Sequence, residues 1–153
     1  MNKATVLISL IISMVANSMG NPTPSEWTII TVDSVEMSRI FNLEKITPIK
    51  LSNEEGYNTL RLINRDFTSI KLRLNLKTSR TIDEYKFQLV SGINEKNDKL
   101  IFVQCIGKKL PQWIQSKWKS KLIYLKCARE ELITIKINLS TDTIYEVAQS
   151  NCE

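Results

Sequence analysis

Cationic side chains beside a tryptophan are the residues of this chain best suited to bind a partner. The stretch SIKLRLNLKTS, residues 69–79, alternates apolar with polar side chains, and its polar side carries Lys71, Arg73 and Lys77. A second group of cations flanks Trp118 and consists of Lys117, Lys119 and Lys121. Cations close to an indole suit a sulfated or acidic glycan, an anionic lipid headgroup or an acidic protein surface.

The charge of the chain is concentrated in one block. The formal net charge is +5, and residues 99–129 contain eight Lys and Arg but no Asp or Glu. A local field of one sign attracts anions, although a solvated, lysine-rich surface would have the same composition. Nucleic acid could use the same charges, but the export signal described below argues against it.

Residues able to catalyse a reaction are scarce. The chain has no histidine, no Gly-rich phosphate loop and no Cys-x-x-Cys pair, so the commonest general base and the usual catalytic zinc ligands are missing. Adjacent carboxylates occur at Glu54-Glu55, Asp83-Glu84 and Glu130-Glu131. Neighbouring residues on a strand point to opposite sides, so such a pair could not act together on one substrate as the two carboxylates of a glycosidase do. We expect solvated turn acids here, and therefore no enzyme, no metal site and no cofactor.

The three cysteines predict a disulfide. Cys105 lies on the same side of its predicted strand as Ile101 and Val103, and Cys127 shares a side with Ile123 and Leu125. Because both cysteines lie on the side of their predicted strands that faces the core, we predict a Cys105–Cys127 disulfide. The alternatives are that Cys152 pairs with one of them, or that both are free; an unpaired Cys152 would allow a covalent dimer.

The N-terminal twenty residues, MNKATVLISLIISMVANSMG, are typical of a secretory signal peptide. A single Lys3 precedes an apolar block from Ala4 to Val15, and small residues follow. The block is too short to cross a bilayer comfortably, so the sequence predicts a secreted, extracellular product of residues 21–153 that does not span a membrane. The sequon Asn138-Leu139-Ser140 predicts an N-glycan at Asn138, as in a glycoprotein.

These residues must be positioned by strands, since the apolar pattern has a period of two nearly everywhere. Alternating or wholly apolar runs occur at 27–32, 59–64, 69–77, 85–90, 100–106, 122–127, 133–139 and 144–147, and residues 36–51 resemble two weaker strands. Polar turns such as NEEGYN and NEKND separate them. The pattern predicts an all-β protein with one antiparallel β-sandwich domain, or alternatively a small calycin-like β-barrel.

One part of the sequence follows the order of a known family. Asn64 and Asp66 precede the alternating run Ile70–Leu76; Tyr85–Val90, a turn with Gly92, Asn94 and Lys96, and the apolar run Leu100–Val103 follow. Trp113 and Trp118 come next. This order resembles the first half of a farnesoic acid O-methyltransferase-like domain, found in secreted invertebrate proteins, although its Gly-Trp pairs and histidine are absent. The resemblance implies a β-sandwich that serves recognition.

The sequence therefore predicts a secreted, non-enzymatic binding module whose basic face recognises an acidic glycan, an anionic lipid or an acidic protein. The alternative is an extracellular, lipocalin-like carrier of a small apolar ligand. Trp27 near the first strand is reminiscent of lipocalins, whose Gly-x-Trp motif reads Ser25-Glu26-Trp27 here.

Overall fold

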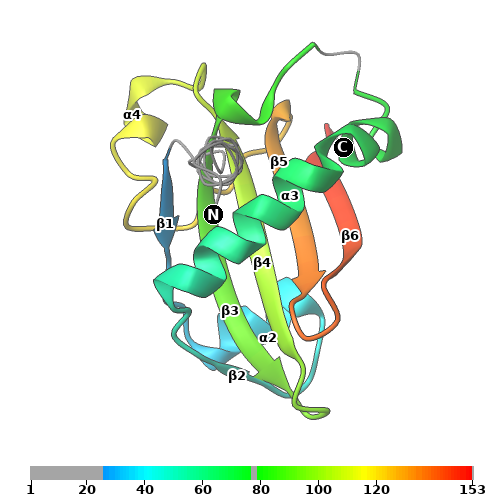
Figure 1. The fold of residues 1–153 in the computed structure, drawn as a ribbon. Coiled ribbons are helices and arrows are strands. Elements are labelled where there is room, and N and C mark those ends of the chain that lie inside the picture. Colours follow the sequence, from blue (N-terminus) through cyan, green and yellow to red (C-terminus); the bar gives the residue numbers. More distant parts are fainter. Residues whose placement is uncertain (1–25, 77–78, 153) are drawn as a thin grey trace, which may run out of the picture.

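A computed structural model describes residues 26–76 and 79–152; the predicted signal peptide, residues 1–20, and Lys77 lie outside the described residues. The described residues form one six-stranded mixed sheet with the order β1-β3-β4-β5-β6, in which β2 also pairs with β3 (Figure 1). Its strands are β1 (Trp27–Ile29), β2 (Ile46–Pro48), β3 (Tyr85–Asn94), β4 (Lys99–Gly107), β5 (Arg129–Asn138) and β6 (Thr143–Ser150).

Strands β3 to β6 form an antiparallel meander, because each pairs with the next along the chain. Two asparagines stabilise the turn between β3 and β4. The Asn94 side-chain oxygen accepts hydrogen bonds from the backbone N–H groups of Lys96 and Asp98, and Asn97 has a φ of 64°. Asn tolerates this left-handed conformation better than most residues. The strands predicted at 85–90, 100–106, 133–139 and 144–147, and the NEKND turn, are therefore confirmed.

Helix α3 (Asn53–Arg73) crosses one face of the sheet (Figure 1). Ser52 caps it in a capping box with Glu55, and Lys71 and Arg73 lie in the last turn, where cations favour the helix dipole. Leu60, Ile63, Phe67 and Ile70 recur at helical spacing and are buried against β3, β4 and β5. We call this side of the sheet the α3 face.

The predicted strands at 59–64 and 69–77 are therefore wrong. Residues 70 and 74 satisfy a period of two and also the i, i+4 spacing of a helix, and both Ile70 and Leu74 pack in the core under α3. Leu72, which the alternation placed with them, is 77% exposed. The helix ends at Arg73, and the left-handed conformation of Asn75, with a φ of 50°, prevents it from continuing.

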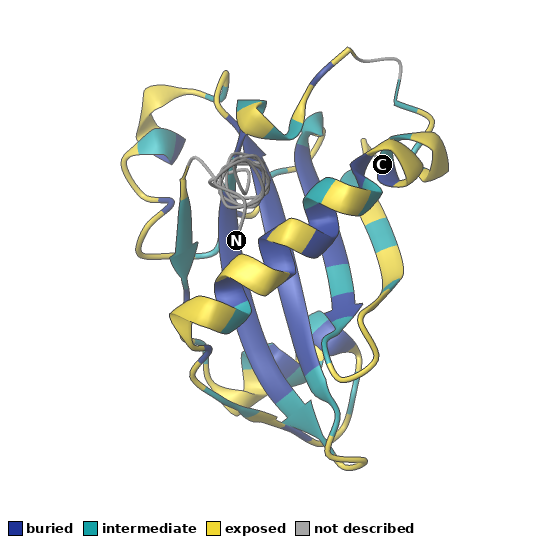
Figure 2. Ribbon diagram, in the orientation of Figure 1, coloured by how far each residue is buried: buried dark blue, intermediate teal, exposed yellow. Residues whose placement is uncertain are grey.

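The opposite side of the sheet, which we call the second face, is covered in two places. Helix α2 (Ser34–Phe41) packs Met37 and Phe41 against Val90 and Phe102. The segment that contains the short helix α4 (Gln112–Gln115) packs against Ile106 and Leu132. Because both faces are covered, β3 and β4 are buried along most of their length (Figure 2).

The β-rich character predicted from the sequence is confirmed, whereas the all-β class is confirmed only in part, since helix makes up 29% of the structure. The strands form one sheet that does not close into a calycin-like barrel. Residues 36–51, predicted as two strands, form most of α2 and then β2, and residues 122–127 form no strand.

Candidate functional site

The second cationic group lies on a protruding segment, residues 108–126, which we call the lysine lobe. It contains α4 and a series of turns, and it lies between β4 and β5 in the chain (Figure 1). Six lysines of the lobe are exposed: Lys108, Lys109, Lys117, Lys119, Lys121 and Lys126. No Asp or Glu occurs within the lobe, so its charge is uniformly positive.

Trp118 anchors this lobe to the sheet. Its side chain is only 3% exposed and packs with Ile106, Ile114 and Leu132. The ammonium groups of Lys86 and Lys119 lie 5.2 and 5.6 Å from the ring centroid, within the range of a cation–π interaction. Trp118 thus acts in packing and is not open to a partner, whereas Trp113 on α4 is 57% exposed.

Two buried glutamines hold the backbone of the lobe. The Gln104 amide nitrogen donates to the Ile123 carbonyl, and the Ile123 N–H donates to the Gln104 oxygen, both at 3.0 Å. The Gln88 amide donates to the carbonyls of Trp118 and Lys121. Sequence reasoning missed both residues; their signal is a glutamine in the middle of each of two largely apolar strands.

The first cationic group does not form a strand face. Lys71 is half-buried at the end of α3, where its ammonium group donates to the Arg80 carbonyl at 3.2 Å and lies 5.6 Å from the Phe67 ring centroid. Arg73 is exposed on the same turn, and Lys77 lies outside the described residues. The hypothesis of one basic strand face across 71–77 is therefore wrong.

The two cationic groups lie on opposite faces of the sheet. Strand β4 shows this directly, because Cys105 packs in the cluster under α3 while its neighbour Ile106 packs with Trp118 of the lobe. Side chains of adjacent strand residues point to opposite faces. A single partner surface therefore cannot contact both groups at once unless it wraps around the edge of the sheet.

The disulfide joins Cys127 to Cys152, with Cα atoms 4.4 Å apart, and the predicted Cys105–Cys127 bridge is wrong. Cys127 lies in a bend and has a φ of 60°, which is not the conformation of a strand. The alternation that predicted a core position for Cys127 therefore does not apply to it. Its N–H donates to the carbonyl of Asn151, so the chain end after β6 lies beside it. Pairing within the chain leaves Cys152 unable to form the predicted covalent dimer.

Cys105 is a free thiol, fully buried in the cluster beneath α3. Burial raises its pKa far above the usual range of a thiol, because the apolar surroundings disfavour the thiolate. The thiol is therefore a packing group at the pH of any biological compartment.

The predicted glycosylation site, Asn138, is the last residue of β5. The Asn138 side-chain oxygen accepts a hydrogen bond from the Ser140 N–H at 3.0 Å, and Asn138 is partly exposed. Glycosylation of Asn138 stays a prediction.

A shallow apolar groove of about 540 Å³ runs along the second face beside the lobe. Its apolar lining residues include Phe102, Ile123, Leu125 and Leu132. Tyr124 lies at its margin and donates its hydroxyl to the Glu36 carboxylate of α2. Burial and this hydrogen bond raise the pKa of Tyr124 to about 12, so the hydroxyl keeps its proton.

Within residues 26–76 and 79–152, no group of three or more Cys, Asp or Glu side chains is placed to hold a metal ion. Over the same residues, none of the helices combines the length and the apolar character that a membrane crossing requires. Comparisons with protein-family models, with curated proteins and with solved structures found no match. The resemblance to the farnesoic acid O-methyltransferase-like domain stays a prediction.

Proposed function

We propose that this chain is a secreted, non-enzymatic binding module that attaches to an acidic partner through the lysine lobe. The observation that carries the proposal is the lobe's uniform charge: six exposed lysines within nineteen residues and no acid among them. Within the described residues, no carboxylate pairs with Lys109, Lys117 or Lys121. Such a field raises the local concentration of anionic partners.

The construction of the lobe supports a role in binding. Its backbone is fixed from beneath by Trp118 and the two glutamines, so the lysines project outward from a supported loop. Trp113 adds an exposed indole between Lys109 and Lys117 in the sequence. Indole rings beside cations favour the interface of an anionic lipid surface, where the ring sits among headgroups and the lysines meet their charge.

Charge reversal in the lobe tests this function. The variant Lys117→Glu/Lys119→Glu/Lys121→Glu is compared with Lys50→Glu/Arg73→Glu/Lys96→Glu, which changes the net charge equally at exposed sites outside the lobe. Each lysine near an anionic membrane contributes about 1 kcal/mol, so the lobe variant should bind vesicles containing phosphatidylserine about 100-fold more weakly. The control variant should retain most of the binding.

Binding is measured by cosedimentation at two salt concentrations. The three targets are these vesicles, neutral phosphatidylcholine vesicles and immobilised sulfated polysaccharide. Binding to phosphatidylserine vesicles that weakens with salt supports the proposal. Preference for the polysaccharide at equal salt would assign the lobe to an acidic glycan. The absence of salt-sensitive binding to any of these would reject the basic-lobe function. Lys109→Glu/Lys126→Glu repeats the test without touching the Trp118 contact.

The groove beside the lobe favours a second candidate, a carrier of a small apolar ligand. At about 540 Å³, with Phe102, Ile123, Leu125 and Leu132 along it, the groove has the size and the apolar lining of a ligand site. Native mass spectrometry of secreted protein separates the two candidates: a co-purifying lipid favours the carrier, and the bare polypeptide favours the binding module.

A further inference from the structure

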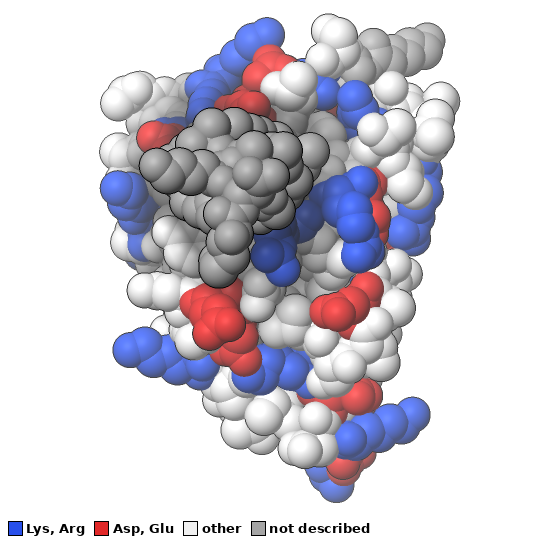
Figure 3. Space-filling model, in the orientation of Figure 1, with Lys and Arg blue, Asp and Glu red and all other residues white. Residues whose placement is uncertain are grey.

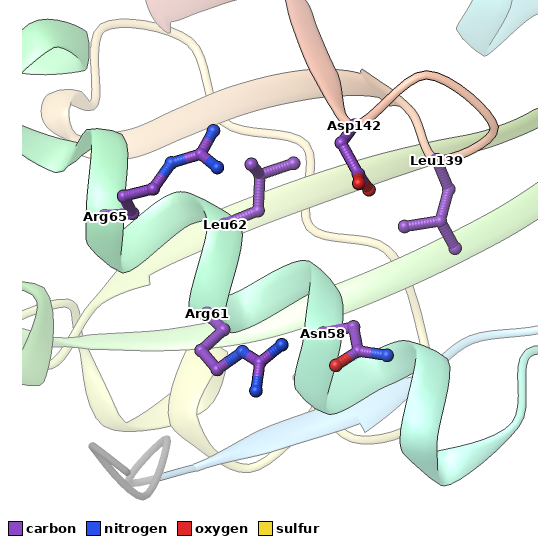
Figure 4. Close-up of a pocket in the computed structure, with 6 residues that line it drawn as sticks. All are labelled: Asn58, Arg61, Leu62, Arg65, Leu139 and Asp142. Atoms are coloured by element: carbon purple, nitrogen blue, oxygen red, sulfur yellow. The ribbon is translucent and has the colours of Figure 1, made fainter. Parts of the chain in front are cut away.

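A second, polar groove lies on the α3 face, away from the lysine lobe. It has a volume of about 490 Å³ and lies between α3 and the turn that joins β5 to β6 (Figure 4). Its lining residues are Asn58, Arg61, Leu62, Arg65, Leu139 and Asp142. Figure 4 shows Leu62 between Arg65 and Asp142, with Leu139 on the far side of Asp142.

Helix α3 contributes two arginine side chains to the lining of this groove. Arg61 and Arg65 are four residues apart, so they lie on successive turns about 6 Å apart along the axis. Asn58 lies one turn before Arg61 on the same stripe and adds a neutral amide. In the space-filling view of this side, Lys and Arg atoms lie beside the middle of α3, with Asp and Glu atoms next to them (Figure 3).

Arg65 is held in place by its neighbour. Its Nε and Nη2 atoms donate to the two Asp66 carboxylate oxygens at 2.8 and 2.9 Å. This pairing raises the pKa of Arg65 and lowers that of Asp66, chiefly through the hydrogen bonds. A guanidinium has five N–H donors, so three of them stay available to a ligand. Arg61 is exposed and has no carboxylate partner among the described residues.

Asp142 limits how much negative charge the groove can accept. It lies in the turn opposite α3, and its carboxylate points toward the groove (Figure 4). Its charge acts on Arg65 across this space. A doubly charged ligand would meet more repulsion from Asp142 than a singly charged one.

We propose that this groove binds a sulfate monoester, with the singly charged oxyanion on Arg61 and Arg65 and the body of the ligand over Leu62 and Leu139. Planar guanidinium groups match the geometry of such oxyanions. The Asn58 amide supplies a further donor. The site does not depend on the lysine lobe, because the two lie on opposite faces of the sheet and are altered by different variants.

Two probes with the same body and different charge test the proposal: 4-nitrophenyl sulfate, a monoanion, and 4-nitrophenyl phosphate, a dianion near pH 7.5. Calorimetric titration of the purified protein should give a Kd for the sulfate on the order of 1 mM, as expected for a ligand of this size. The phosphate should bind at least threefold more weakly. Equal or tighter binding of the phosphate, or no binding of the sulfate, would overturn the assignment.

Variants locate the site and test its selectivity. Arg61→Gln/Arg65→Gln should weaken sulfate binding at least tenfold, whereas Lys50→Gln/Arg73→Gln, with the same change in net charge, should leave it within twofold. Asp142→Asn should bring phosphate binding to the level of sulfate or beyond. This last readout compares two ligands on one protein, so it holds even if the arginine variants lose stability. Loss of binding in the control variant equal to that in the arginine variant would refute the site.

Discussion

The two faces of the sheet are stabilised in different ways, although the same strands supply both. On the α3 face, Phe87, Ile101, Val103 and Ile135 form one continuous apolar cluster with the helix. On the second face, the apolar contacts divide into a cluster under α2 and another under the lysine lobe. Gln104 lies on this face and bonds to the backbone of the lobe.

The contrast indicates which part of the molecule should open first. A continuous apolar cluster resists opening in proportion to the area it buries, whereas a loop attached by a smaller apolar cluster and a few hydrogen bonds can detach locally. We therefore expect the α3 face to set the free energy of unfolding. The lobe proposed to bind lies on the face that we expect to open more easily.

The largest effect is expected from Ile63→Ala, which truncates a fully buried side chain of α3. The free energy of unfolding should fall by about 4 kcal/mol, from lost burial and the cavity that remains. Urea unfolding followed by fluorescence measures it. Leu72→Ala, on the same helix but 77% exposed, should change stability by less than about 0.5 kcal/mol. A similar loss in both variants would contradict the assignment of the buried side of α3.

A smaller loss is expected when the disulfide that joins the segment before β5 to the segment after β6 is removed. Cys127→Ser/Cys152→Ser opens a loop with a sequence separation of 25, which should lower the free energy of unfolding by about 3 kcal/mol. Cys105→Ala should keep the bridge, and non-reducing peptide mapping checks this. A peptide containing Cys105 linked to Cys127 in the unaltered protein would contradict the pairing seen here.

The sequence predicted the meander because its strands combine alternation with β-branched residues. Ile133, Ile135 and Ile137 alternate with polar residues and form β5 as expected. The run at 70–76 alternates equally well, but it is rich in leucine. The segment NEEGYN, residues 53–58, was predicted as a turn and instead begins α3, capped by Ser52 and Glu55. Leucine favours helix, and the cap fixed where the helix began.

The candidate site was predicted in its composition and not in its geometry. The acid-free block at 99–129 is visible in the sequence, and its central lysines are exposed as a binding surface requires. The burial of Trp118 depends on the turns after α4, which carry no periodicity. The Cys127–Cys152 pair likewise depends on where β6 ends relative to β5, and such long-range placement leaves no local signal.

Gln104→Ala should weaken the attachment of the lobe while leaving the α3 face intact. It removes both hydrogen bonds to Ile123 and leaves the buried N–H and carbonyl groups of that residue without their partner, at a cost of about 2 kcal/mol. Hydrogen exchange should accelerate in residues 118–125 far more than in α3. The exposed Gln112→Ala is the control and should change neither quantity measurably. Equal acceleration in α3 would mean that the two faces open together.

The smallest effect concerns a charge at the rim of the α3 face. Glu55 joins the first turn of α3 to Lys99 of β4, and its hydrogen bonds to Lys99 and Ser52 hold its pKa below the ordinary value of 4.5. Because the folded-state pKa is lowered, the stability that the carboxylate adds is present above about pH 4.5 and is lost as the pH falls through the folded-state pKa.

Glu55→Gln keeps an amide able to complete the capping box and removes only the charge. It should cost about 0.5–1 kcal/mol at pH 7, and the difference from the unaltered protein should shrink below pH 4.5 and close once Glu55 is protonated. Urea unfolding from pH 7 to pH 2.5 measures this, with Glu54→Gln in the same turn as the control. A difference that stays constant to pH 2.5 would show that shape, and not charge, sets the contribution of Glu55. A loss as large as that of Ile63→Ala would mean that the α3 face depends on its rim charges as much as on its apolar cluster.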